Sequence, residues 1–218
     1  MPQRFDLVVF DWDGTLIDSA GAIVACIQAA CRDLDLPVPD DERASHVIGL
    51  GLADALGHAV PSLPPSEYGR LAERYRVHFL ARDAALKLFP GTREMLGALR
   101  RRGHTLAIAT GKSRAGLARA LETTSLAALF DATRCADQTA PKPAPDMLLE
   151  LIEELDADPA RTLMIGDTSH DLQMASGAGV AAAAVSYGAH AAATLAVLEP
   201  LALLHSMQEL DAWLAANA

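Results

Sequence analysis

The sequence predicts an α/β fold, in which a Rossmann-like parallel sheet is covered by helices on both faces and carries a small helical cap domain. Three observations indicate this. Residues 5–10 form a short apolar run that is typical of a buried parallel strand. After Pro90 and Gly91, strand-like and helix-like segments alternate to the end of the chain, as in right-handed βαβ units. Between about residues 40 and 87 the pattern is helical, with no convincing strand.

The simplest domain arrangement is a sheet domain interrupted by an insertion. We expect residues 1–16 and 88–218 to form the core and residues 17–87 to form the helical cap. Asp18 and Ser19 can cap the first helix of the insertion, in which the apolar residues recur every three or four positions: Ile23, Ile27, Cys31 and Leu34. A later helix carries Leu71, Tyr75, His78 and Phe79 on one face.

The part of the chain after Pro90 contains the remaining core elements. Expected strands lie at residues 105–109, 162–165 and 181–185, with a last short strand at 201–204. Expected helices lie at residues 92–102, 114–121, 145–155, 172–178 and 207–216. This order places a helix between most successive strands, which supports a parallel sheet.

Composition excludes several classes of function. The 218 residues are 51% hydrophobic and 21% charged, which is too apolar for a disordered chain. A formal charge of −10 repels nucleic acids and anionic lipids, and only 5% of residues are aromatic, so few are present to stack on bases. We therefore expect no nucleic-acid partner.

Cysteine usage and the N-terminal segment favour a cytoplasmic protein. Cys26, Cys31 and Cys135 show no metal-binding spacing, and their odd number favours reduced, buried thiols. The apolar run at residues 7–10 is too short for a signal peptide or a membrane span. We expect no membrane partner, whereas a monomer and a homodimer both stay open.

Polar clusters follow three of the expected strands. Asp11 and Asp13 follow the first strand, Thr110 ends the second, and Asp167 follows the strand at 162–165. In an open α/β sheet, ligands bind beyond the carboxyl ends of the strands. Lys142 lies in a loop just before a helix and adds a positive charge on a long stem.

Such a group of acids requires a cation, and carboxylate oxygens without cysteine or histidine suit Mg²⁺. The cation and Lys142 together would attract a phosphorylated substrate. A carboxylate facing the phosphoryl group can act as nucleophile, and a second acid can protonate the leaving oxygen and then deprotonate water. Thr110 and nearby backbone amides can hold the phosphoryl oxygens.

These segments resemble the four motifs of the haloacid dehalogenase-like superfamily, in order and over essentially the whole chain. The first motif is similar to residues 7–15, the second to Thr110, the third to Lys142, and the fourth to Gly166, Asp167 and Asp171. The resemblance implies that Asp11 is the nucleophile and a Mg²⁺ ligand, and that Asp13 is the general acid and base and offers the metal its backbone carbonyl. It also implies that Asp167 binds the metal and that Asp171 supports the metal waters and Lys142.

The position of the insertion resembles the branch of this superfamily that includes phosphoglycolate phosphatase. The cap segment around Gly49 and Gly51 is similar to the glycine-containing substrate loop of that branch, and Gly14, Thr15 and Gly111 are its further expected substrate contacts. Gly111 stands where members of the branch often carry asparagine, a departure that bears on the choice of substrate and not on the phosphoryl chemistry.

The resulting prediction is a Mg²⁺-dependent phosphatase that hydrolyses a small phosphorylated metabolite, phosphoglycolate-like, through an aspartyl-phosphate. One alternative is a phosphomutase of the β-phosphoglucomutase type, which uses the same core and returns the phosphoryl group. Another is a non-catalytic member that binds a phosphorylated ligand or a protein. The set of nucleophile, acid and Lys142 favours the enzyme.

Several of these residues also have purely structural interpretations. Lys142 is otherwise a surface charge in a rigid loop, and Asp171 is otherwise an acid that complements a helix dipole. We expect His170 to be an exposed residue at the start of a helix. Ser113 and Arg114 either meet phosphate at a helix start or simply begin that helix.

Overall fold

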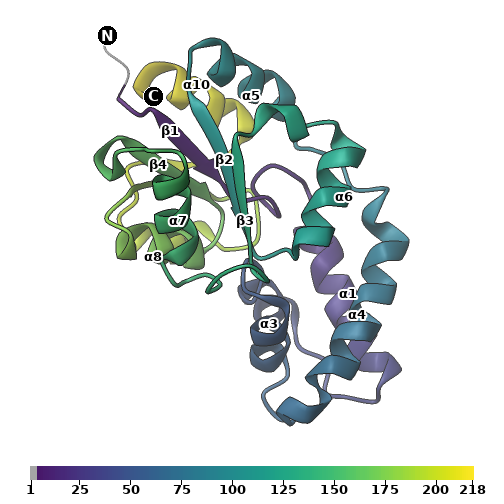
Figure 1. Ribbon diagram of the computed structural model, residues 1–218. Helices are drawn as coiled ribbons and strands as arrows, with labels where there is room; N and C mark the ends of the chain where they lie inside the picture. The colour runs from purple at the N-terminus through teal and green to yellow at the C-terminus, as the bar shows by residue number, and fades with distance from the viewer. Residues whose placement is uncertain (1–3) are drawn as a thin grey trace.

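The computed structural model describes residues 4–218, which form one six-stranded parallel sheet with helices on both faces (Figure 1). The strands are β1 (Leu7–Phe10), β2 (Thr105–Thr110), β3 (Ala132–Cys135), β4 (Thr162–Gly166), β5 (Ala181–Val185) and β6 (Leu203–Leu204). The helices are α1 (Ala20–Asp33), α2 (Asp41–His46), α3 (Leu52–Ala59), α4 (Tyr68–Asp83), α5 (Thr92–Arg101), α6 (Arg114–Thr124), α7 (Asp146–Glu154), α8 (Ser169–Gly177), α9 (Ala192–Ala196) and α10 (Met207–Asn217). Short 3₁₀ turns are η1 (Pro65–Glu67), η2 (Ala127–Leu129) and η3 (Pro159–Arg161). The predicted α/β class with a helical cap is confirmed.

The order of the strands is β3-β2-β1-β4-β5-β6, so β1 lies at the centre of the sheet. Phe10, the last residue of β1, is opposite Ile108 of β2 and Ile165 of β4. The carboxyl ends of these three strands therefore lie at the same edge. The strand order reverses between β1 and β4, and open α/β sheets bind their ligands at this kind of position.

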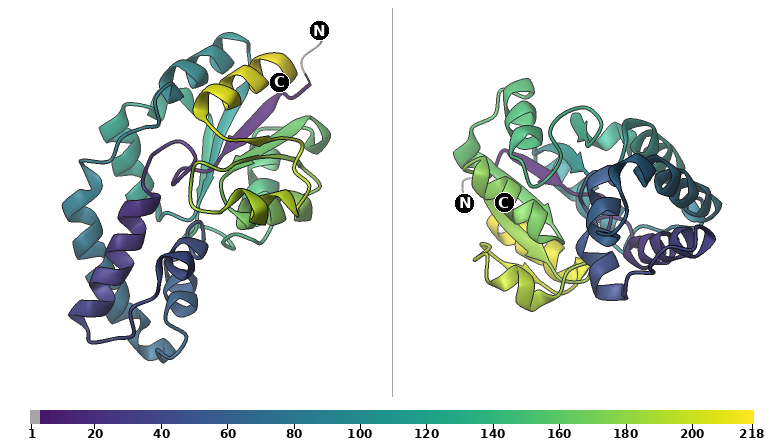
Figure 2. Two further views of the ribbon diagram at one scale, coloured as in Figure 1. Left: turned by 180° about the vertical axis from the view of Figure 1, so that it is seen from behind. Right: turned by 90° about the horizontal axis from the view of Figure 1, so that it is seen from below.

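Alternate residues of each strand supply the two sides of the core. Val8 and Phe10 belong to one apolar cluster with residues of α5, α6 and α10, while Leu7 and Val9 belong to another with residues of α7 and α8. Successive side chains of a strand point to opposite faces, so an unbroken apolar run is what a sheet covered on both faces requires. Figure 2 shows α10 over the face that is turned away from α7 and α8 in Figure 1.

Helices α1 to α4 form the cap, which lies beyond the carboxyl ends of the strands (Figure 1). Helices α1 and α4 lie side by side, and the cap has an apolar cluster of its own that includes Ile27, Leu71 and Phe79. On the predicted face of α4, Leu71 and Phe79 are buried, while Tyr75 and His78 are half-buried. The cap is thus a small packed unit set over the edge of the sheet where ligands bind.

The local predictions differ from the structure mainly at β3 and α8. Strand β3 was not predicted, because it has only four residues and its sequence is partly polar. It lies at the edge of the sheet, where a strand needs fewer apolar side chains, so its sequence shows little apolar periodicity. Helix α8 begins at Ser169 rather than at residue 172, because Thr168 and Asp171 cap it earlier than the apolar pattern indicates. Helix α9 lies between the strands expected at 181–185 and 201–204, outside the expected helix ranges.

The three cysteines are buried and form no disulfide. Burial raises the pKa of the thiols of Cys26, Cys31 and Cys135, which keeps them protonated and weakly reactive. They act as small apolar packing residues. Within residues 4–218, none of the helices combines the length and the apolar character needed to cross a bilayer.

Candidate active site

Three strand ends bring polar side chains to one point on the edge of the sheet. Asp11 directly follows β1, Thr110 is the last residue of β2, and Asp167 directly follows β4. All three are 0% exposed. Because β1 lies between β2 and β4, Asp11 has the other two strand ends on either side. The residues that the sequence placed at strand ends are thus neighbours in space.

Lys142 extends from the loop before α7 into this group of acids. Its Nζ lies 2.6 Å from Asp11 Oδ1 and 2.6 Å from Asp171 Oδ1, and its side chain is completely buried. Burial by itself would lower the pKa of Lys142, but the two carboxylates outweigh it and raise this pKa above its usual value. Lys142 is therefore a buried cation that stays charged, and the alternative of a surface charge does not describe it.

Asp171 uses its two oxygens for two different partners. Oδ1 accepts a hydrogen bond from Lys142, and Oδ2 accepts from the backbone N–H and the hydroxyl of Thr168, at 3.0 and 2.7 Å. The bond from the Thr168 N–H, together with the bond that the Asp171 N–H donates to Thr168 Oγ1, forms a capping box at the start of α8. Asp171 is therefore both an acid at a helix N-terminus and a partner of Lys142, so the two interpretations of this residue coexist.

Asp167 is held in place by two donors and by close backbone packing. Thr15 Oγ1 donates to its Oδ1 at 2.7 Å, and the backbone N–H of Ala189 donates to its Oδ2 at 2.7 Å. A Cβ atom at Gly14 or Gly188 would collide with the Asp167 carboxylate, and Gly14 also has a positive φ of 81°. Gly14 and Thr15, expected as substrate contacts, pack on Asp167 in this structure.

Asp11, Asp167 and Asp171 are buried and each offers a carboxylate oxygen within 4.8 Å of the others, so the group could hold a metal ion. Asp11 Oδ2 is buried without a hydrogen-bond partner. Burial raises the pKa of Asp11 to about 7 against the opposing attraction of Lys142, and burial together with the neighbouring acids raises the pKa of Asp167. An unpartnered buried carboxylate oxygen is costly unless a cation or proton neutralises it, and an all-oxygen set of this kind fits Mg²⁺.

The Asp13 carboxylate is not part of this group and has its own partners. Ser19 Oγ donates to Asp13 Oδ1 at 2.7 Å, and Lys112 Nζ lies 3.1 Å from the same oxygen. Ser19 is at the N-cap position of α1 but makes no side-chain cap, because its hydroxyl is committed to Asp13. Neither contact was predicted from the sequence. The only available signal was that Lys112 lies two residues after Thr110 and Ser19 lies six residues after Asp13.

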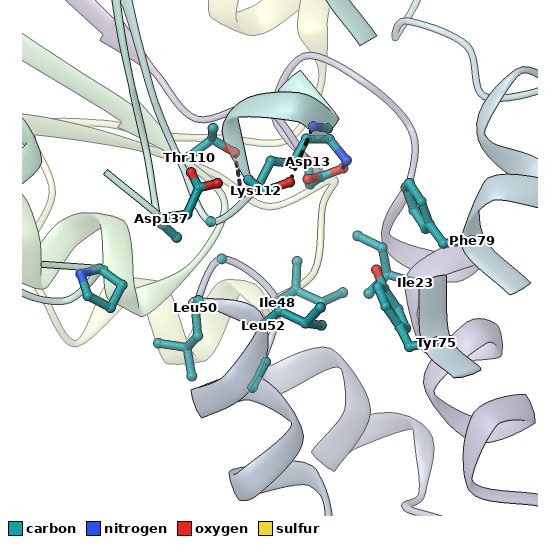
Figure 3. A pocket seen from close by; sticks show the side chains of 18 of the residues that line it. Asp13, Ile23, Ile48, Leu50, Leu52, Tyr75, Phe79, Thr110, Lys112 and Asp137 are labelled. Atoms are coloured by element: carbon teal, nitrogen blue, oxygen red, sulfur yellow. Dashed lines mark hydrogen bonds and ion pairs between the residues drawn. The ribbon is translucent and has the colours of Figure 1, made fainter. Parts of the chain in front are cut away.

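A cavity of about 560 Å³ separates the core from the cap and opens onto these residues (Figure 3). Its core side includes Asp11, Asp13, Thr110, Gly111 and Lys112, and its cap side includes Gly49 and Gly51. The cap segment lies directly on the end of β2, since a Cβ atom at Gly111 would be 2.5 Å from the carbonyl oxygen of Gly49 and 2.6 Å from that of Leu50. Gly111 therefore permits this close approach of cap and core.

The expectation that His170 is exposed was wrong, because the cap covers the start of α8. His170 is 7% exposed, and its Nε2 donates to the backbone carbonyl of His46 in the cap at 2.8 Å. His190 Nε2 donates to the same carbonyl at 3.2 Å, and the three rings lie 5.0–5.4 Å apart. Burial lowers the pKa of His170 and lowers that of His190 to about 4, so both imidazoles are neutral links between core and cap.

Ser113 and Arg114 occupy the start of α6. Ser113 Oγ accepts from the backbone N–H of Gly116 at 3.2 Å, which makes it a helix cap, and Ser113 also lies on the cavity wall. The backbone N–H of Arg114 donates to Asp137 Oδ1 at 2.8 Å, and its guanidinium donates to Thr133. Ser113 is thus a cap beside the cavity, while the Arg114 side chain is engaged elsewhere.

The fold is an α/β sheet with a helical cap, and a group of acids and a lysine lies at the edge of the sheet that the cap covers. This combination defines a class of hydrolases. The family model for haloacid dehalogenase-like hydrolases matches residues 8–185, and the chain belongs to this family. The resemblance seen in the motifs is therefore confirmed.

Curated relatives and solved structures agree with this assignment. The chain is 39% identical over 209 residues to "Probable phosphatase IndB" of Dickeya dadantii, covering 93% of this chain and 90% of that protein. It is 28% identical over 226 residues to phosphoglycolate phosphatase of Escherichia coli, with the same two coverages. The crystal structure of a predicted phosphatase from Clostridium acetobutylicum superposes with a TM-score of 0.86 at 25% identity, over 97% of this chain and 99% of that one. A hydrolase from Pseudomonas syringae shares the fold, with a TM-score of 0.88 at 22% identity over 99% of both chains.

Proposed function

We propose that this hydrolase is a Mg²⁺-dependent phosphatase that cleaves a small phosphomonoester through an aspartyl-phosphate on Asp11. The observation that carries the proposal is the arrangement of Asp11 itself. One of its oxygens is bound by Lys142, the other has no partner, and the residue borders the cavity between core and cap. Relatives named as phosphatases over nearly the whole chain support the same reaction.

Asp11, Asp167 and Asp171 would hold the Mg²⁺ ion. The family resemblance adds the backbone carbonyl of Asp13 as a further candidate ligand. When bound, the ion supplies positive charge that keeps the acids ionised and offsets charge on the phosphoryl oxygens. Lys142 contributes a second, permanent positive charge at the same point. Thr110 lines the cavity, and we propose that its hydroxyl and the backbone N–H groups beyond β2 donate to phosphoryl oxygens.

The proposed reaction has two displacement steps. A carboxylate oxygen of Asp11 forms a bond to phosphorus while the bond from phosphorus to the ester oxygen breaks, and Asp13 gives its proton to the departing alcohol. Asp13 then takes a proton from a water molecule, whose oxygen attacks phosphorus and releases inorganic phosphate from Asp11. Ser19 and Lys112 hold one oxygen of Asp13, which leaves the other free to transfer the proton.

The experiment that tests this proposal measures phosphate release from p-nitrophenyl phosphate and from phosphoglycolate, with Mg²⁺ and with a chelator. We expect turnover only with Mg²⁺, and a loss of at least about 1,000-fold in Asp11→Asn, as when a covalent nucleophile is removed. Asp211→Asn, which alters an exposed acid of α10, is the matched control and should retain full activity. Equal rates in the chelator, or an active Asp11→Asn variant, would overturn the proposal.

A further inference from the structure

The cavity that meets Asp11 has two chemically different ends. Its core end carries Asp13, Thr110 and Lys112, whereas its cap end is formed by aliphatic and aromatic side chains (Figure 3). A phosphoryl group bound at the core end directs its ester oxygen, and whatever that oxygen carries, into the remaining space. The wall at the cap end therefore contacts the alcohol part of the substrate.

The cap end is built from apolar residues of three helices and one loop. Ile23, Ile48 and Phe79 are 8%, 3% and 8% exposed, and Leu52 and Tyr75 are half-buried on the same wall. Tyr75 stacks on Phe79 with ring centroids 5.7 Å apart. Burial raises the pKa of Tyr75 well above its usual value, so its ring and neutral hydroxyl complete an uncharged wall.

The cations that line the cavity are Arg76, Lys112 and Arg119. Lys112 is paired with Asp13 at 3.1 Å and lies 4.6 Å from the centre of the Phe79 ring. Arg76 and Arg119 are exposed, and Arg119 pairs with Asp83. The remaining charges of the lining, on Asp54 and Asp137, are negative and exposed. Lys112 and Arg119 are thus already paired and Arg76 is exposed, whereas the side chains of Ile23, Ile48 and Leu52 offer a substrate carboxylate no donor.

The volume of the cavity also indicates a substrate with a large apolar group. A cavity of about 560 Å³ lies within the range of roughly 300–1,000 Å³ that holds drug-sized ligands. A group as small as glycolate would leave most of the apolar wall without a contact. A longer apolar group would cover it and would be favoured by removal of this surface from water.

We infer that the preferred substrates are phosphomonoesters whose alcohol carries an extended apolar chain or ring, which packs between Ile23, Ile48, Leu52, Tyr75 and Phe79. This rests on the proposed phosphatase function, because it places the phosphoryl group at Asp11. In this inference, the wall at the cap end of the cavity selects the substrate, whereas the core residues set only the chemistry.

The test uses ethyl, butyl and hexyl phosphate, which share a primary alcohol as leaving group and differ only in apolar length. We expect kcat/KM to rise by at least about tenfold from ethyl to hexyl phosphate, since each buried methylene contributes up to about fourfold. Phosphoglycolate should be a poorer substrate than hexyl phosphate. A flat series, or a preference for phosphoglycolate, would overturn the inference and leave the phosphatase reaction standing.

A binding measurement separates this inference from the reaction itself. Ethylphosphonate and hexylphosphonate are not hydrolysed, and calorimetry should show tighter binding of the hexyl compound with a negative heat-capacity change. If neither phosphate ester is cleaved but hexylphosphonate binds more tightly, the proposed reaction fails and the apolar site stands. Equal binding of the two phosphonates would refute the apolar site whatever the activity.

A pair of matched variants locates the effect on the cap wall. Leu52→Asn changes a half-buried residue at the start of α3, and it should reduce the ratio of kcat/KM for hexyl phosphate to kcat/KM for ethyl phosphate by at least about threefold. Leu149→Asn makes the same change at a 47% exposed position of α7 outside the cavity, and the preference should remain. An unchanged preference in Leu52→Asn would show that this wall does not contact the substrate.

Discussion

A single methyl group at position 111 tests whether turnover requires the cap segment to lie on the core. A Cβ atom there would be 2.5 Å from the Gly49 carbonyl oxygen, whereas ordinary contact begins at 3.4 Å, so in Gly111→Ala the loop must retreat by about 0.9 Å. The atom in the way is backbone, which cannot rotate aside as a side chain can. Gly111 does not have a positive φ, so alanine causes no backbone strain of its own.

The expected size of the effect follows from the contacts that tie this segment to the core. The carbonyl of His46, just before the segment, accepts hydrogen bonds from His170 at 2.8 Å and from His190 at 3.2 Å. Each such bond contributes about 0.5–1.5 kcal/mol, so losing both would disfavour the observed cap position by about 1–3 kcal/mol. If turnover requires that position, kcat/KM should fall by about 5- to 150-fold.

The assay compares kcat/KM of Gly111→Ala with that of the wild-type protein and measures hydrogen exchange of the amides in residues 46–51. We expect lower kcat/KM, faster exchange in that segment and a melting temperature within a few degrees of wild type. Gly69→Ala is the control, because no heavy atom lies within 4 Å of its Cβ position. Wild-type activity and exchange in Gly111→Ala would refute the reasoning, as would a loss of activity that simply follows global unfolding.

Two further predictions concern the buried charges. In Lys142→Met, two buried carboxylates lose their partner, which typically costs about 3–5 kcal/mol, so thermal unfolding near neutral pH should occur about 6–20 °C lower. Lys87→Met, at an exposed position, should not change the melting temperature, and an equally stable Lys142→Met variant would mean that the buried ion pairs contribute nothing. Because the folded-state pKa of Asp11 is raised to about 7, the folded protein without metal binds this proton more tightly than the unfolded chain, so its stability should fall as pH rises from about 4 to 7. Because Mg²⁺ competes with that proton for Asp11, the affinity for Mg²⁺ should rise about tenfold per pH unit up to about pH 7, which calorimetry can measure. An affinity that does not depend on pH would contradict the assignment of Asp11 as a ligand.

The parts of the site that could be predicted are those whose signal is local in the chain. Asp11, Thr110 and Asp167 each stand at the end of an apolar run that predicts a strand. Because the carboxyl ends of parallel strands share one edge of the sheet, these residues could be predicted to lie close together. The family motifs also include Lys142 and Asp171. The strand β3 could not be predicted in this way, because a short edge strand carries little periodic signal.

Other contacts of the site depend on packing between distant segments. The hydroxyl of Ser19 could equally have capped α1, and only the path of the chain into the cap directs it to Asp13. Likewise, His170 is exposed or buried according to where α2 of the cap comes to lie, and the His46 carbonyl is 124 residues away in the chain. No pattern within either segment contains that information.

By itself, the sequence determined the class of fold, the family and the acids and lysine that meet at the edge of the sheet, because apolar periodicity and motif spacing are properties of short segments. Only the tertiary structure decided how cap and core meet: the contact at Gly111, the histidine links and the apolar wall of the cavity. These arise when side chains far apart in the chain are packed against one another, and their surroundings exist only in the folded molecule.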